Sequence, residues 1–195
     1  MKALSLFTRS LVATAAVGAL ALPARAQSAQ PWSLQASVLA DNQKIGSSAI
    51  SGVGFEAMVR YTPSAWSVGL GYEYATHSSN GQTLDISGAF LEPRYAIDIG
   101  SDRVAPYLAG RVAFLNESSK LRAPTNLIDF SSGGTAFGAG AGILIRASKT
   151  VNIDLGAAIV QQSFQDASRN GVTVSFTSFA GYIAKAGISI GFGGK

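Results

Sequence analysis

The sequence has 195 residues, of which 22 are glycine, 13% are charged and none is cysteine. Without cysteine, neither a disulfide bridge nor a cysteine-ligated metal can stabilise the chain. The net charge of +4 does not indicate nucleic-acid binding. Three of the 15 basic residues fall in an amino-terminal leader without acids, and the rest of the chain carries only about +1.

Residues 1–26 are predicted to be a cleaved signal peptide. Two basic residues introduce an apolar run at residues 10–22, and residues 24–26, Ala-Arg-Ala, have the small-x-small pattern of a cleavage site. The alternative is a retained membrane anchor, but the run is short for a helix that spans a bilayer. The sequence therefore predicts a signal peptide at residues 1–26 and one domain at residues 27–195.

After the leader, large apolar residues alternate with small or polar residues in eight successive runs. Strict alternation is typical of β-strands that have two different faces. In the third run, Trp66, Val68 and Leu70 alternate with Ser67 and Gly69. In the fourth run the alternation shifts near residue 88, which predicts a β-bulge. In chain order, the predicted strands are residues 32–40, 52–62, 65–76, 84–97, 105–115, 135–146, 151–160 and 180–192.

The connections between these strands alternate in length. Residues 62–65, 98–104 and 147–150 are short, whereas 41–51, 76–83, 116–134 and 161–172 are longer and more polar. Short turns at one end and long loops at the other are typical of a transmembrane β-barrel. Strands of about ten residues are long enough for a tilted crossing of the bilayer. We expect an all-β, eight-stranded antiparallel up-and-down transmembrane β-barrel, closed because lipid cannot hydrogen-bond to an open sheet edge.

In such a barrel the large apolar side chains face lipid and the other face lines the lumen. The lumen of an eight-stranded barrel is narrow and filled by side chains, so inward charges must be paired. We interpret the inward charges as a plug that fixes strand register and blocks conduction, with an ion or proton pathway as the alternative. The predicted lumen charges are Glu56, Arg60, Glu73, Glu92, Arg94, Arg111, Arg146, Asp154 and Lys185.

Aromatic residues gather towards both ends of the predicted strands. Amphipathic rings are typical of the two membrane–water interfaces, where barrels carry aromatic girdles. At the short-turn ends these residues are Trp32, Tyr61, Trp66, Tyr95 and Phe192, and towards the long-loop ends they are Tyr72, Tyr74, Phe114 and Phe137.

Two stretches resemble small outer-membrane β-barrels of Gram-negative bacteria, of the OmpA-barrel and OmpX type. Residues 91–114, "LEPRYAIDIGSDRVAPYLAGRVAF", are similar to a central hairpin of these domains, and residues 185–192, "KAGISIGF", resemble their carboxy-terminal assembly signal. The resemblance implies that Lys185, Gly187, Ile190 and Phe192 are read by the barrel-assembly machinery. It also implies periplasmic chaperones during biogenesis and a place in the outer membrane.

One short motif raises the question of catalysis. His77, Ser79 and Asn80 are similar to the H-x-S-N pattern of outer-membrane lipid A deacylases, in which histidine acts as general base and serine as nucleophile. The same residues are also ordinary turn composition, because Asn-Gly is a common tight-turn dipeptide. We favour the turn, and we predict no catalytic, cofactor-binding or metal site.

The predicted function is therefore a non-enzymatic outer-membrane role exercised through surface loops. Residues 116–134 mix basic and apolar side chains. They are interpreted as a partly ordered cap on the barrel rim, or as a contact surface for lipopolysaccharide, a surface protein or a host ligand. Narrow passive passage of small or hydrophobic solutes and lipid A deacylation remain alternatives. Outer-membrane lipid is the expected environment, the chain is expected to be monomeric, and no nucleic acid is expected as a partner.

Overall fold

The computed structural model describes residues 30–45, 48–79, 82–122, 127–169, 172–174 and 179–193. The predicted signal peptide lies outside these ranges. Within them, no helix is long and apolar enough to cross a membrane.

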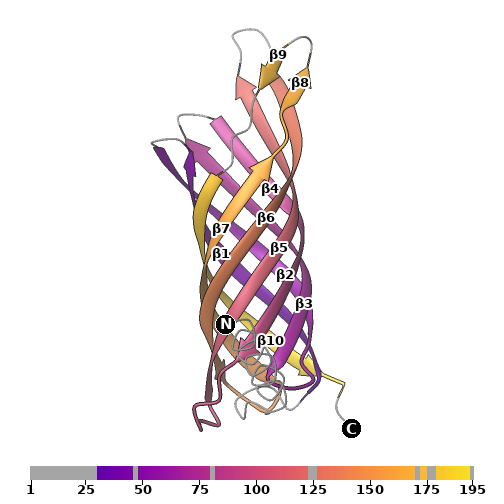
Figure 1. Ribbon diagram of the computed structural model, residues 1–195, viewed down its shortest axis with the longest axis vertical. Coiled ribbons are helices and arrows are strands. Elements are labelled where there is room, and N and C mark those ends of the chain that lie inside the picture. Colours follow the sequence, from indigo (N-terminus) through magenta and orange to yellow (C-terminus); the bar gives the residue numbers. More distant parts are fainter. Residues whose placement is uncertain are drawn as a thin grey trace, which may run out of the picture.

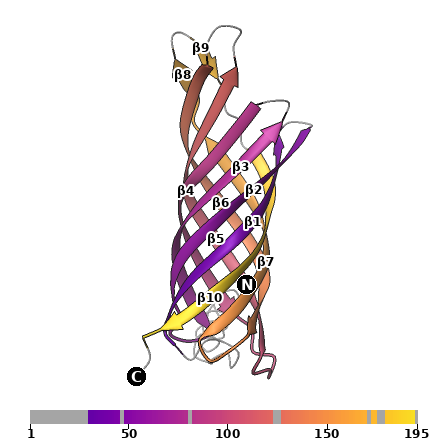
Figure 2. The same ribbon diagram turned by 180° about the vertical axis from the view of Figure 1, so that it is seen from behind.

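Eight long antiparallel strands close into a barrel (Figures 1 and 2). Each strand pairs with its neighbour in sequence, and the barrel closes where the first strand pairs with the last, from Trp32 opposite Phe192 to Lys44 opposite Ala180. The fold class predicted from the sequence is confirmed. The barrel strands are β1 (Trp32–Ile45), β2 (Ser48–Tyr61), β3 (Trp66–Ser79), β4 (Gln82–Ala96), β5 (Val104–Arg122), β6 (Leu127–Arg146), β7 (Val151–Phe164) and β10 (Phe179–Phe192).

The predicted short turns lie together at one end of the barrel, but at the other end only two residues separate β1 from β2 and β3 from β4. Short turns join β2 to β3, β4 to β5 and β6 to β7, and the start of β1 and the end of β10 lie at that same end. Side chains cap these turns: the Gly100 amide, at a φ of 74°, donates to Asp98 Oδ1 over 2.8 Å. A positive φ suits glycine because it has no Cβ.

The strands are longer than predicted at the opposite end. Residues 41–45 continue β1, and the predicted loop at 116–134 is largely the end of β5 and the start of β6. The ladder between these strands runs without a break from Val104 opposite Ile145 to Arg122 opposite Leu127. The prediction of a cap at this loop was wrong. Backbone hydrogen bonds extend a ladder equally well beside polar residues, where the alternation used for prediction fades.

A small second sheet was not predicted at all. Within residues 161–172, β7 continues to Phe164 and is followed by β8 (Ala167–Arg169), which pairs with β9 (Val172–Val174). β5 and β6 project beyond the other barrel strands, and β8 and β9 lie at this projecting end (Figures 1 and 2).

The bulge predicted near Gly88 is absent. β4 keeps one register against β3 from Trp66 opposite Tyr95 to Ser79 opposite Gln82. The apparent shift arose because Ile86 is apolar yet points inward, where it packs with Phe90 in a hydrophobic cluster inside the barrel. Apolar residues on both faces of β4 therefore show that the lumen is lined by apolar side chains near Ile86. They do not show a shift in strand register.

Candidate functional site

The lumen is the candidate site, because the alternation of each strand brings charged side chains together inside it. Four carboxylates from four strands, Glu56, Glu73, Glu92 and Asp154, are buried there. Four bases face them: Arg60, Arg94, Arg111 and Lys185. The charges of this set balance, as a buried polar core requires.

Glu92 is the hub of this network. Its Oε1 atom accepts from Arg60 Nη2 and from Arg94 Nε, each over 2.7 Å. Its Oε2 atom accepts from Lys185 Nζ over 2.8 Å and lies 3.3 Å from Arg111 Nη2. One carboxylate on β4 thereby joins bases from β2, β4, β5 and β10.

Arg111 links the hub to the other two glutamates. Its Nη1 atom lies 2.9 Å from Glu73 Oε2, and its Nη2 atom donates to Glu56. Lys185 also contacts Glu56, over 3.1 Å. The Arg111 guanidinium lies 3.9 Å from the centre of the Phe90 ring, a cation–π arrangement. Through this contact the charged layer meets the apolar side chains around Phe90.

Asp154 anchors the network towards the short-turn end. Its Oδ2 atom accepts from Arg94 Nη2 over 2.7 Å and from Gln35 Nε2 over 2.6 Å. Its Oδ1 atom accepts from the Tyr107 hydroxyl over 2.7 Å, and the Arg94 guanidinium lies 4.2 Å from the centre of the Tyr107 ring. Three strands other than its own, β1, β4 and β5, are thus tied to β7.

The remaining predicted base lies at the end of a strand. Arg146 is the last residue of β6, is only partly buried, and its backbone amide donates to the Arg103 carbonyl over 2.7 Å. The alternation of residues along the strand predicted only that Arg146 points inward. In the structure its backbone lies beside the short turn between β6 and β7.

An apolar plug lies above the charged layer. It includes Met58, Ile86, Phe90, Leu115 and Phe164, all with at most 6% of their surface exposed. The alternation places two of these residues on inward faces, Met58 with Glu56 and Phe90 with Glu92. Leu115 lies at a predicted strand end, and Phe164 lies beyond the predicted end of β7. The plug and the charged layer together fill the middle of the barrel.

A second polar group, which sequence reasoning missed, lies nearer the extracellular end. His77 Nε2 is 3.2 Å from Asp41 Oδ2, and the Gln43 amide donates to the same oxygen over 3.2 Å. Glu117 is buried at this end as well. Asp41, Gln43 and Glu117 were assigned to loops because the alternation of apolar and polar residues ends before them, so the sequence carries no signal that would have found them.

The histidine of the suspected catalytic motif faces the lumen. Only 1% of His77 is exposed, and its ring contacts Asp41. Ser79 is the last residue of β3, while Asn80 and the side chain of Ser79 lie outside the description. Among the described residues there is no group of three side chains suited to hold a metal ion.

The predicted girdle residues lie on the outer surface. On the short-turn side, the Trp32 and Tyr61 rings are 4.7 Å apart and the Trp66 and Tyr95 rings are 5.1 Å apart. Tyr72, Phe114 and Phe137 are exposed towards the other end. In the predicted assembly signal, Ile190 and Phe192 face outward, while Lys185 and Gly187 face the lumen.

Comparisons with known proteins agree with this geometry. Residues 12–183 match the family described as outer membrane protein beta-barrel domain. The solved structure of Neisserial surface protein A is 16% identical, with a TM-score of 0.64, covering 85% of this chain and 100% of that one. That of Ail, the attachment invasion locus protein of Yersinia pestis, is 15% identical, with a TM-score of 0.55, covering 82% and 97%. A comparison with curated proteins finds no match.

Proposed function

The chain belongs to the outer membrane protein β-barrel domain family and resides in the bacterial outer membrane, and from this premise we propose that it is a non-enzymatic, non-conducting barrel that presents its extracellular strands to a partner at the cell surface. One observation carries the proposal: the lumen is filled in the middle, while β5 and β6 project beyond the other barrel strands at the end opposite the short turns.

The filled lumen supports a role other than transport. A solute crossing the barrel would have to break the Glu92 contacts with Arg60, Arg94 and Lys185, and then displace Phe90 and Phe164 above them. Separating a buried ion pair leaves uncompensated charges and costs several kcal/mol, about 3–5 kcal/mol for one partner. Passive passage of small or hydrophobic solutes is the alternative that this arrangement disfavours.

The projecting strands support a surface role. β5 has 19 residues and β6 has 20, about twice the length that a tilted crossing of the membrane needs. Ordered strands outside the membrane offer a preformed surface, and binding residues are commonly carried on such extensions of a rigid scaffold. Binding to lipopolysaccharide, a surface protein or a host ligand would take place here.

The position of His77 supports the absence of enzymatic activity. A deacylase must bring its histidine and serine to the lipid A acyl chains in the outer leaflet, whereas His77 is buried inside the barrel against Asp41. Lipid A mass spectrometry of cells with wild-type protein and with Ser79→Ala tests this point. Identical lipid A profiles are expected, and loss of a deacylated species in the variant would overturn it.

Planar-bilayer recordings test the filled lumen. We expect no stable conductance from the wild-type barrel. A variant with Phe90→Ala and Arg111→Ala, which removes the contact between the apolar plug and the charged layer, should show a clear increase in conductance. A folded wild-type barrel that conducts steadily would favour the channel alternative.

The surface role is tested by shortening the projecting hairpin. Ser118 pairs with Ser131, so residues 119–130 can be replaced by Asn-Gly, which closes a two-residue hairpin turn. A deletion strain is complemented with wild-type or shortened chain, and adhesion to abiotic and epithelial surfaces and permeability to a hydrophilic dye are measured. Loss of adhesion with unchanged permeability is expected. Unchanged adhesion in the deletion strain would contradict the proposal.

A further inference from the structure

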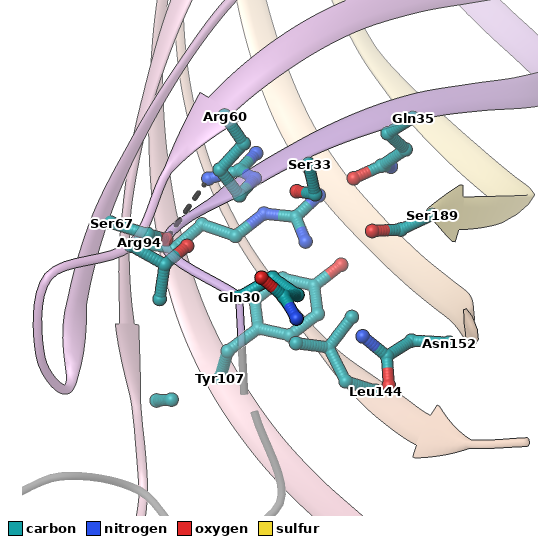
Figure 3. Close-up of a pocket in the computed structure, with 12 residues that line it drawn as sticks. Gln30, Ser33, Gln35, Arg60, Ser67, Arg94, Tyr107, Leu144, Asn152 and Ser189 are labelled. Carbon is teal, nitrogen blue, oxygen red and sulfur yellow. Dashed lines mark hydrogen bonds between the residues drawn. The ribbon is translucent and has the colours of Figure 1, made fainter. Parts of the chain in front are cut away.

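A small polar cavity lies at the short-turn, periplasmic end of the lumen (Figure 3). Arg60 and Arg94 line it together with Ser33, Asn152 and Ser189. Its free volume is about 20 Å³. That is room for about one small species.

The charge of the cavity wall has one sign. Its lining includes two arginines and no acidic residue among those described. Glu92 and Asp154, which neutralise Arg94, contact its Nε and Nη2 atoms. Figure 3 shows the Arg94 side chain extending past Arg60 towards Ser33, so that positive charge reaches the cavity while the carboxylates remain outside its lining.

Both arginines keep an unused donor. Arg94 is 2% exposed and Arg60 is 5% exposed. Within the described part of the chain, Arg94 Nη1 and Arg60 Nε have no hydrogen-bond partner. Buried N–H groups almost always find an acceptor, and those of a charged group lose the most when they do not. Two buried guanidinium groups with unpartnered donors therefore lie beside one cavity, where an acceptor would satisfy them.

We propose that this cavity binds one small monovalent anion of the size of chloride, which enters from the periplasm. Arg94 and Arg60 supply the charge. The hydroxyls of Ser33 and Ser189 and the NH₂ group of Asn152 supply neutral donors around it. The inference goes beyond the proposed surface function and does not depend on it.

Chloride-35 NMR of the refolded protein in detergent tests the site in solution. A bound chloride relaxes fast, so the wild type is expected to broaden the chloride line in a saturable way that bromide reverses. Asn152→Asp places a carboxylate in the cavity wall and is expected to weaken chloride binding at least tenfold. The control, Asn116→Asp, makes the same change at an exposed position on β5, far from the short turns, and should bind chloride as the wild type does.

Bromide provides a second measurement that needs no variant. Crystals of the wild type grown in bromide are expected to show one anomalous peak between Arg94 and Ser33. A water molecule there without an anomalous peak would overturn the proposal, even if Asn152→Asp fails to fold. Saturable chloride binding that is equally strong in Asn152→Asp would overturn it as well.

Discussion

Glu92 and Arg94, two residues apart on β4, form an ion pair of 2.7 Å inside the barrel. Alternate residues of a strand point to the same face, so this pair is local in sequence. The other bases that reach Glu92 come from β2, β5 and β10, up to 93 residues away. A local pair thus becomes the centre of a network that joins strands around the barrel.

The first prediction concerns this centre. Glu92→Gln keeps the side-chain shape but removes the charge that Arg60, Arg94 and Lys185 share. We expect the free energy of unfolding to fall by about 3–5 kcal/mol, because buried bases are left without their acid. Guanidinium unfolding in detergent, followed by tryptophan fluorescence, measures the change. Asp102→Asn, at an exposed turn position, should stay within about 0.5 kcal/mol of the wild type.

The second prediction tests which face meets lipid. Leu70 lies on the outer surface with 64% of its area exposed. We expect Leu70→Arg to cost about 2–4 kcal/mol in lipid vesicles, and an arginine outside the apolar band about 0–1 kcal/mol. Asn116→Arg, beyond the extracellular girdle, provides that comparison. Equal costs for the two variants would mean that Leu70 does not face the hydrocarbon layer.

A third prediction concerns the packing of the Tyr107 ring against β6 inside the barrel. The Tyr107 ring lies over Gly142 on β6, where an added methyl group would overlap the ring and its hydroxyl. Gly142→Ala should therefore push Tyr107 away from Asp154 and lower the free energy of unfolding by about 1–3 kcal/mol.

The matched control is Gly133→Ala on the same strand. A methyl group at Gly133 would meet no atom within 4 Å. We expect this variant to be neutral or slightly more stable than the wild type, because alanine restricts the unfolded chain. If the two variants have the same free energy of unfolding, close packing against Tyr107 is not the reason for glycine at position 142.

The fourth prediction is a pH dependence at the extracellular end. Glu117 follows the Phe114 girdle position, its outward neighbour Asn116 is polar and exposed, and the residue lies outside the membrane-spanning segment. Burial raises the pKa of Glu117 to about 7, and the nearby His77 opposes this rise. The folded protein therefore binds a proton at Glu117 more tightly than the unfolded chain does.

The sign of the effect follows from this difference. Between pH 4.5 and about 7 the folded state holds more protons, so the free energy of unfolding should decrease as pH rises through this range and level off above it. Glu117→Gln should remove this decrease. Unfolding curves of the two proteins at several pH values measure it, and parallel pH profiles would show that Glu117 is not responsible.

The sequence determined the barrel itself. Alternation assigns Leu70 to the outside and Glu73 to the inside whatever the neighbours are, because side chains of a strand point to opposite faces. The even number of strands and the alternating loop lengths then predicted the closure and the ends. Alternation does not indicate the inward face where both faces are apolar, at Ile86, or where polar residues continue a strand, at Asp41 and Glu117.

Only the tertiary structure decided which charges meet. Parity placed Arg146 and Arg111 on the same inner face, yet Arg111 reaches Glu56 and Glu73 in the middle of the lumen while Arg146 stays at the short turn. The level of a side chain along the barrel axis depends on the register of all eight strands and on their tilt. The sequence of a single strand shows neither of these. For the same reason, the cationic cavity beside Arg60 and Arg94 arises only when all eight strands bring inward residues to one level.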